Sequence, residues 1–291
     1  MTLTRRRFLT ISAAFAGLPA TAQAHSWQGR AFGADVFLTI RGPRDAADAA
    51  MTEVRNLITE AEQMFSLYDP ASALSGLNSA GVLHLPPPRF LDLMQAADTA
   101  FRLTDGLFDP TVQPLWAALA EGRDTAPVIA AMGWQKLRFD PTKITLGRSQ
   151  ALTFNGIAQG FATDLVADAL AARGLTDTLV NIGEYRANGG PWTVGIADPA
   201  HGFLGHRTLT KGAIATSSPA ATLIGAQGHI LHANAQPRWS SVTVEASNAT
   251  LADSLSTALV LAPRDQISEI KARTDITRVT LIDFSGDLST L

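Results

Sequence analysis

The stretch NATLADSLSTAL at residues 248–259 predicts an amphipathic helix. Asn248 is a residue type favoured at helix N-caps, because its side chain can accept a hydrogen bond from a free backbone N–H group. Leu251, Leu255 and Leu259 recur at helical spacing and form one apolar face. The stretch therefore marks a helix that packs this face against a hydrophobic core.

Asp253 and Thr257 lie four residues apart in this helix, so their side chains share one face, roughly opposite Leu251 and Leu255. A carboxylate and a hydroxyl suit a hard cation such as Mg2+, and phosphate oxygens and water can complete its shell. The alternative is an ordinary solvent-facing surface of the helix. Because Asp253 is the only carboxylate of an otherwise apolar helix, we favour a cation site.

The rest of the chain is helix-rich in its first half and strand-rich in its second half. Apolar residues recur at helical spacing over residues 45–65, 89–104, 115–133, 162–173, 249–261 and 265–273. Short apolar runs predict strands at residues 32–41, 136–146, 151–154, 178–182, 192–197, 212–215, 241–245 and 278–282. Because helices and strands are largely segregated, the pattern favours an α+β fold. No repeat or low-complexity linker appears, so we expect a single compact domain over residues 25–291.

The N-terminus has the pattern of a secretory signal. RRRFL at residues 5–9 precedes an uncharged, largely apolar run at residues 11–22, and an A-x-A cleavage site ends at Ala24. An arginine pair in this position is typical of twin-arginine export. An anchor helix is the alternative, but the run is shorter than the roughly 20 residues that span a bilayer. We expect a signal over residues 1–24, cleaved near Ala24, and a periplasmic protein without a stable membrane anchor.

The composition excludes several classes of function. The 291 residues include no cysteine, so disulfides, thiolate metal sites and cysteine nucleophiles are excluded. The formal net charge is −3, and no run of basic residues follows the N-terminal signal. Binding to nucleic acid or to an anionic membrane surface is therefore not expected. Any metal must be held by oxygen or nitrogen ligands.

A second candidate segment, LTFNGIAQGF at residues 152–161, leads into the helix expected from Ala162. A glycine-bearing loop before a helix exposes unpaired N–H groups beside the positive end of the helix dipole, which suits an anion. The spacing of Gly156 and Gly160 matches neither a Walker loop nor a Rossmann fingerprint. Glycines that only allow close packing are the alternative.

Further candidates lie in loops. TDGLFDPTV at residues 104–112 reads as a turn, and Tyr68 lies in a similar Asp-Pro loop. The Tyr68 ring could stack on a flat ligand or cover the edge of the core. His229 and His232 are three residues apart and could bind zinc, but a role for one of them as a general base fits better. An unperturbed histidine already titrates near neutral pH.

Taken in order, these segments resemble the FAD:protein FMN transferase (ApbE) family. The segments that carry the resemblance are AFG at residues 31–33, MFSLY at 64–68, LN at 77–78, TDGLFDPTV at 104–112, GIAQGF at 156–161, LVNIG at 179–183 and TLADSLSTA at 250–258. They cover most of the chain after the signal. The resemblance implies a T-fold-like flavin transferase domain.

The resemblance also implies a site and a reaction. Mg2+ would be held by the Ala158 carbonyl, Asp253 and Thr257. FAD, as substrate or bound ligand, would lie among Phe32, Tyr68, Leu107, Phe108, Asp109, Asn155, Phe161 and Ile230. Tyr68 would lie against the flavin ring, and His229 would be the base for the acceptor. FMN would pass to a threonine of an exported or membrane-bound acceptor flavoprotein, and AMP would leave.

The chain departs from the family pattern around the flavin and acceptor side. The replaced positions are Asn155 for glycine, Gln159 for lysine, Glu184-Tyr185 for G-D-I, Ser218-Pro219 for G-D, and the segment from His232 to Gln236 for D-P-x-T-G. The metal pair is unchanged. Two alternatives therefore stay open: a FAD pyrophosphatase that yields FMN and AMP, and a non-catalytic periplasmic protein that binds or delivers FAD.

Overall fold

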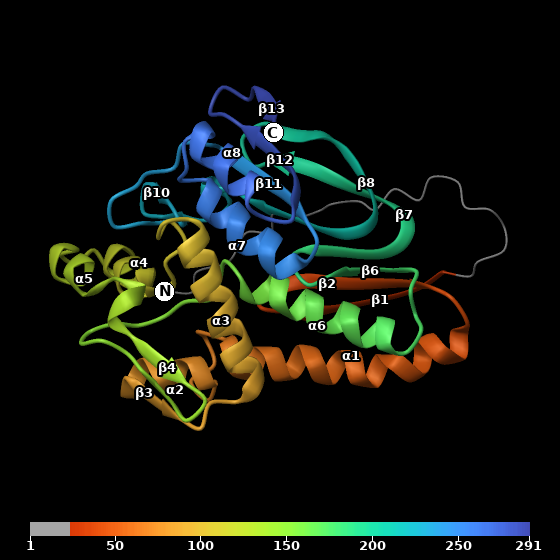
Figure 1. The fold of residues 1–291 in the computed structure, drawn as a ribbon, viewed down its shortest axis with the longest axis horizontal. Helices are drawn as coiled ribbons and strands as arrows, with labels where there is room; N and C mark the ends of the chain where they lie inside the picture. The colour runs from red at the N-terminus through yellow and green to blue at the C-terminus, as the bar shows by residue number, and fades with distance from the viewer. Residues whose placement is uncertain (1–23) are drawn as a thin grey trace.

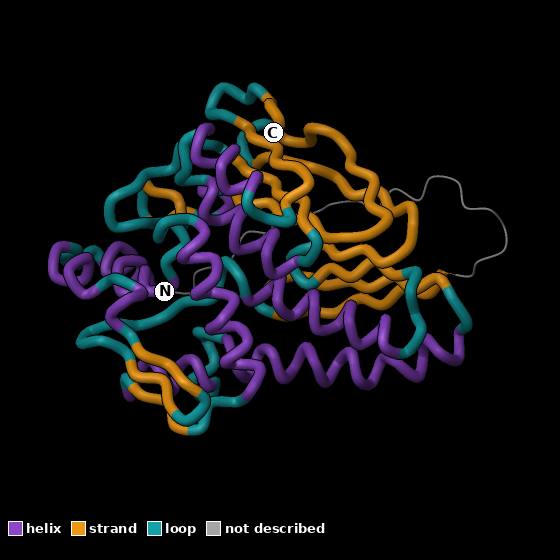
Figure 2. The backbone as a smooth tube through the Cα atoms, viewed as in Figure 1, coloured by secondary structure: helices purple, strands orange, loops and turns teal. Residues whose placement is uncertain are grey.

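The computed structural model describes residues 24–291, so the expected signal lies, except for Ala24, outside the described residues. Figure 1 shows a large twisted sheet with helices packed along one face, and a smaller region of short strands and helices at one end of the molecule. The α+β class is confirmed. Figure 2 shows the long strands together in one layer, and this layer includes the strands from the start of the chain, red in Figure 1, beside later ones.

Within residues 24–291, eight strands form the main sheet in the order β1-β2-β6-β7-β8-β11-β12-β13, and all neighbouring pairs are antiparallel. Their bounds are β1 Ala24–Ala31, β2 Ala34–Arg41, β6 Thr178–Asn181, β7 Tyr185–Asp198, β8 Gly202–Ser217, β11 Ser241–Ala246, β12 Ile276–Ile282 and β13 Leu288–Thr290. The short strands β3 Val82–His84, β4 Arg138–Asp140 and β5 Lys143–Thr145 form a second sheet, and β9 Leu223–Ile224 pairs with β10 Gln227–Gly228.

Most helices follow the expected spacing, but the helix expected over residues 162–173 begins four residues earlier, at Ala158. Their bounds are α1 Arg44–Phe65, α2 Ala73–Ala80, α3 Pro88–Leu103, α4 Gln113–Glu121, α5 Ala126–Ala131, α6 Ala158–Ala172, α7 Ala249–Leu259 and α8 Arg264–Ala272. In the described part of the chain, three short 3-10 helices cover Pro110–Val112, Trp134–Lys136 and Pro219–Ala221. None of the helices within residues 24–291 combines the length and the apolar character needed to cross a membrane.

Packing of α6 and α7 positions the site. α6 lies on β6 and β7, α7 lies on β8 and β11, and the two helices contact each other (Figure 1). α1 packs against α6 from the other side. Because the side chains of a strand alternate between the two faces of the sheet, Val242 and Val244 of β11 pack under α7 while Thr243 faces away. The two central helices are therefore held by apolar contacts with the sheet.

Several expected element boundaries were wrong. Phe32 and Gly33 form the turn between β1 and β2, so the strand there begins at Ala34. The helix expected over residues 115–133 is two helices, because Gly122 adopts a left-handed conformation and ends α4. Residues 136–146 form the short hairpin β4–β5, and residues 151–154 form no strand. The sequence pattern also missed β1 and α2.

Candidate metal and flavin site

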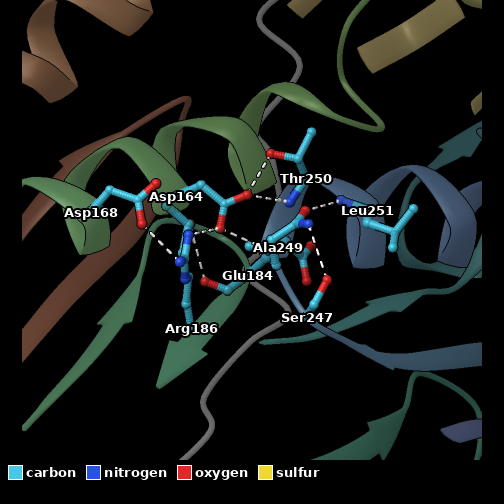
Figure 3. A network of polar contacts seen from close by, with 10 residues as sticks. Asp164, Asp168, Glu184, Arg186, Ser247, Ala249, Thr250 and Leu251 are labelled. Atoms are coloured by element: carbon cyan, nitrogen blue, oxygen red, sulfur yellow. Dashed lines mark hydrogen bonds and ion pairs between the residues drawn. The ribbon is translucent and has the colours of Figure 1, made fainter. Parts of the chain in front are cut away.

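Two acceptors fix the first turn of α7. Asn248 is its N-cap and accepts a hydrogen bond from the N–H of Leu251 (2.8 Å). Asp164 of α6 accepts hydrogen bonds from the N–H groups of Ala249 and Thr250 (both 2.8 Å) and from the Thr250 hydroxyl (2.6 Å), as Figure 3 shows. A carboxylate at this end of a helix also complements the helix dipole. α6 therefore holds α7 by its first turn.

Asp253 lies one turn further along α7 and is only 3% exposed. Its Oδ2 atom accepts a hydrogen bond from the N–H of Gly160 in the first turn of α6 (2.9 Å). Burial raises the pKa of Asp253 to about 7; the Gly160 hydrogen bond lowers it, and the charge of Asp164 raises it further. Among residues 24–291, Oδ1 accepts no hydrogen bond and the carboxylate has no ion-pair partner. Such a buried carboxylate is well suited to bind a cation.

Two glycines let the start of α6 approach α7. A Cβ atom on Gly160 would lie 2.3 Å from the backbone oxygen of Ala249 and 2.7 Å from the Cβ of Asp253. A Cβ atom on Gly156 would lie 2.8 Å from the Oγ1 of Thr257. The close-packing interpretation of these glycines therefore holds. The anion that the Gly160 N–H group meets is the protein's own Asp253 carboxylate.

Two of the expected metal ligands, Asp253 and Thr257, lie against the segment around the start of α6, which also contains the third, Ala158. α7 carries Asp253 and Thr257, and Ala158 is the first residue of α6, two residues before the Gly160 N–H that Asp253 accepts. The Thr257 hydroxyl also lies 3.1 Å from the hydroxyl of Ser217, the last residue of β8. A carboxylate, a hydroxyl and a main-chain carbonyl form a set of oxygen ligands that fits Mg2+. Residues 24–291 contain no cluster of three His, Asp or Glu side chains that could hold a metal ion.

His229 directly follows β10, the second strand of the short hairpin after β8. Its backbone N–H donates to the Pro219 carbonyl (3.2 Å), and its Nδ1 lies 3.0 Å from the same oxygen. Burial lowers the pKa of His229, although hydrogen bonds to the backbone of Pro219 and Thr222 oppose this shift. Pro219 follows Ser217 by two residues, and Ser217 contacts Thr257. The end of β8 therefore connects the candidate base to the candidate metal ligands.

The expected flavin residues of the 104–112 segment lie in one turn after α3. Phe108 is buried, and Leu107 packs between the two largest core clusters. Asp109 accepts hydrogen bonds from the N–H and the hydroxyl of Thr111 (2.9 and 2.6 Å). Burial raises the pKa of Asp109, and these hydrogen bonds, the positive charge of His232 and that of Lys136 oppose the rise.

The other expected flavin residues are spread over three environments. Tyr68 follows α1 and is 64% exposed, and Asn155 is also exposed. Phe32 is partly buried, and its N–H donates to Glu62 of α1 (2.8 Å). Two residues lie within the core: Phe161, which packs edge-to-face on Phe65, and Ile230. Tyr68 and Asn155 therefore present the most open surfaces for a ligand.

A surface hollow of about 490 Å³ lies beside Tyr68, between α2, α4 and the loop before α6. Leu67, Gln113 and Ala151 are among its lining residues. The lining includes none of the expected metal ligands and does not include His229. We therefore define the candidate site by the contact between α6 and α7 and not by this hollow.

Sequence reasoning missed three polar residues of the site. Asp164 holds the start of α7, Ser217 contacts Thr257, and Glu184 lies beside them with a carboxylate that accepts a hydrogen bond from the N–H of Thr216 (3.3 Å). In the sequence, only Glu184 attracted attention, because Glu184-Tyr185 replaces the G-D-I of the family pattern. Their positions depend on contacts between segments far apart in the sequence.

Comparison with known proteins identifies the family and supports the fold. The family model described as the ApbE family matches residues 32–280, which include every expected site residue. The chain belongs to the ApbE family. The structure of the flavin transferase ApbE from Vibrio cholerae superposes with a TM-score of 0.80 at 22% identity, covering 93% of this chain and 97% of that chain. For the apo flavinyl transferase ApbE of Pseudomonas stutzeri, the TM-score is 0.79 at 25% identity, with 93% and 94% covered.

Curated relatives align with this chain over most of its length. The FAD:protein FMN transferase of Haemophilus influenzae is 26% identical over 263 residues, which cover 77% of this chain and 75% of the relative. The enzyme of the same name from Rhodobacter capsulatus is 30% identical over 225 residues, which cover 67% of this chain and 42% of the relative. These relatives are named as enzymes of flavin transfer.

Proposed function

We propose that this chain is a Mg2+-dependent FAD:protein FMN transferase that moves FMN from FAD to a threonine of an acceptor flavoprotein and releases AMP. The observation that carries the proposal is the contact between Asp253, Thr257 and the start of α6, inside a chain that belongs to the ApbE family. A divalent cation there would neutralise negative charge on the diphosphate of FAD. The ApbE relatives support FAD as the substrate.

The chain's own residues supply the remaining chemistry. Asp253, Thr257 and the Ala158 carbonyl would hold the cation, and Gly160 orients the Asp253 carboxylate. Burial lowers the pKa of His229, so its imidazole is neutral at pH 7 and able to accept the proton of the acceptor threonine. The threonine oxygen forms a bond to the phosphorus of FMN as the bond from that phosphorus to the AMP oxygen breaks. AMP then carries away the electron pair of that bond.

We further propose that the protein acts in the periplasm after removal of its signal near Ala24. The basic segment at residues 5–9, the apolar run that follows and the A-x-A site support export. The acceptor is then an exported or membrane-bound flavoprotein.

The test is incubation of the purified protein with FAD, Mg2+ and a threonine-bearing acceptor flavoprotein, followed by separation of nucleotides and of protein. We expect AMP release together with flavin fluorescence that stays on the acceptor after denaturation. AMP without acceptor fluorescence would instead identify a FAD pyrophosphatase. Bound FAD with neither product would identify a binding or delivery protein.

A further inference from the structure

Two consecutive serines at the end of β8 anchor this strand on both faces of the main sheet. The Ser217 hydroxyl lies 3.1 Å from that of Thr257 and 2.8 Å from that of Ser256, both on α7. Side chains alternate along an extended strand, so Ser218 points to the opposite face, where its hydroxyl lies 2.5 Å from that of Ser241 on β11. Ser218 and Ser241 are both buried. The end of β8 is therefore fixed from both sides of the sheet.

Ser218 belongs to a buried network, which we call the Asp198 network, that consists of Asp198, Ser241 and Ser218. The Ser241 hydroxyl donates a hydrogen bond to Oδ2 of Asp198 at the end of β7 (2.5 Å). An ionised carboxylate can only accept, so the single proton of Ser241 is used in this bond. The Ser218 hydroxyl must then donate to the Ser241 oxygen. The network thus connects the carboxylate at the end of β7, through β11, to the residue before Pro219.

The residue that follows Ser218 holds His229. The backbone N–H and the Nδ1 of His229 lie 3.2 and 3.0 Å from one acceptor, the Pro219 carbonyl oxygen. The two segments are tightly packed, because a Cβ atom on Gly228 would lie 2.7 Å from the same oxygen. A carbonyl can only accept, so Nδ1 of the neutral imidazole carries the proton and Nε2 keeps a free lone pair. The Pro219 carbonyl therefore selects the tautomer in which Nε2 can act as a base.

We propose that the Asp198 network positions the His229 imidazole for flavin transfer, by fixing the segment that carries the Pro219 carbonyl. The inference rests on the proposed role of His229 as the base. A general base acts only when its free nitrogen lies within hydrogen-bond reach of the proton that it takes, so a fixed Pro219 carbonyl favours transfer. Ser218 stands where the family pattern has glycine, which has no hydroxyl, so the ApbE resemblance does not imply this contact.

Ser240 and Ser241 provide a matched pair of variants. Both are buried and both donate to Oδ2 of Asp198 (2.7 and 2.5 Å), but Ser241 alone of the two also contacts Ser218. The rate of transfer is measured against FAD concentration for the wild type, Ser241→Ala, Ser218→Ala and Ser240→Ala. We expect Ser241→Ala and Ser218→Ala to lower kcat by about 10- to 100-fold with an unchanged KM for FAD, because a small displacement of a positioned group can cost about 100-fold in rate. Ser240→Ala should keep the wild-type kcat.

The tautomer of His229 gives a second readout, which a general loss of stability would not change. It is measured by nitrogen-15 NMR of histidine-labelled protein, and the spectrum of His229→Gly identifies the signal. We expect the proton on Nδ1 in the wild type and a mixture of both tautomers in Ser218→Ala. Wild-type kcat or an unchanged tautomer in Ser218→Ala, or an equal loss of kcat in Ser240→Ala, would overturn the inference alone. Normal transfer by His229→Gly, or none by the wild type, would overturn the proposed base as well.

Discussion

The site depends first on the environments of a few single residues. Asp253 is a buried carboxylate with one hydrogen bond, and burial raises its pKa to about 7. His229 is partly buried, and burial lowers its pKa. In both residues the neutral form is favoured by the fold alone. A cation would reverse the preference at Asp253, whereas His229 is already in the form that a general base needs.

Replacement of Asp253 by asparagine removes the charge and keeps the hydrogen-bond acceptor for Gly160. We expect Mg2+-dependent FMN transfer to fall by at least about 100-fold, because a bound cation is worth several kcal/mol of charge stabilisation in such reactions. The circular dichroism spectrum should not change. The exposed residue Asp275 provides the control Asp275→Asn, which should transfer at the wild-type rate. Unchanged transfer by Asp253→Asn would remove Asp253 from the site.

Replacement of His229 by glycine should spare FAD binding but lower transfer by about 100- to 10,000-fold, the usual contribution of a general base. Burial lowers the pKa of His229, so the imidazole is neutral at pH 7 and the wild-type rate of transfer should be at its maximum there. The rate should fall only as the pH drops below the ordinary histidine value of about 6.5, where His229 becomes protonated. The measurement is the rate of transfer against pH. Normal transfer by His229→Gly would assign the base elsewhere.

Among the structural elements, the contact between α6 and α7 is the decisive one. Asp164 holds the first turn of α7, and Gly156 and Gly160 allow the start of α6 to touch Thr257 and Asp253. The candidate metal ligands therefore come from two helices that approach closely because Gly156 and Gly160 have no side chains. Any added atom at this contact moves the ligands apart.

The substitution Gly160→Ala would place a methyl group 2.3 Å from the backbone oxygen of Ala249. We expect it to lower the free energy of unfolding by about 1–3 kcal/mol, as is typical of overpacked cores, and to weaken Mg2+ binding. The matched control is Gly76→Ala in α2, where the methyl group meets nothing within 4 Å. It should raise the free energy of unfolding by up to about 1 kcal/mol. Denaturant titration measures the free energy of unfolding of both variants. Equal values for Gly160→Ala and Gly76→Ala would contradict the claim that Gly160 is required for close packing of α6 and α7.

The sequence predicted the helices better than their contacts. The apolar spacing of α1 and the N-cap of α7 are local signals, and both were correct to within one or two residues at their starts. β1 was missed because it resembles no apolar run, and its place in the sheet comes from pairing with β2. Asp253 and Thr257 were predictable from their spacing on one helix. Asp164 was not, because its contact with the first turn of α7 arises only when α6 and α7 pack together.

For the molecule as a whole, the long hairpin of β7 and β8 is tied to the rest of the sheet by a buried carboxylate. Asp198, at the end of β7, is 3% exposed. It accepts hydrogen bonds from the hydroxyl groups of Ser240 and Ser241 at the start of β11, and from the N–H groups of Ala200 and His201. Burial raises its pKa, but these hydrogen bonds outweigh burial and hold the pKa of Asp198 to about 2.

This lowered pKa predicts how stability depends on pH. A carboxyl group with a pKa of about 2 in the fold and about 4 when unfolded stabilises the protein above pH 4, and this contribution is lost as the pH falls toward 2. Asp198→Asn should therefore lower the free energy of unfolding by roughly 2 kcal/mol at pH 7. Denaturant titration from pH 7 to pH 2 measures the effect, with the exposed Asp92→Asn as control. If the free energies of unfolding of the wild type and Asp198→Asn differed by the same amount from pH 7 to pH 2, the stabilising role of the ionised Asp198 would be contradicted.

The most direct measurement is the intact mass of an acceptor flavoprotein after incubation with this chain, FAD and Mg2+. We predict a gain of one FMN on the acceptor, lost when EDTA is added or when the chain carries Asp253→Asn. The gain should also disappear when the acceptor threonine is replaced by alanine. An acceptor of unchanged mass in the presence of the wild-type chain and Mg2+, or a gain that persists with Asp253→Asn, would contradict the proposed transfer at this site.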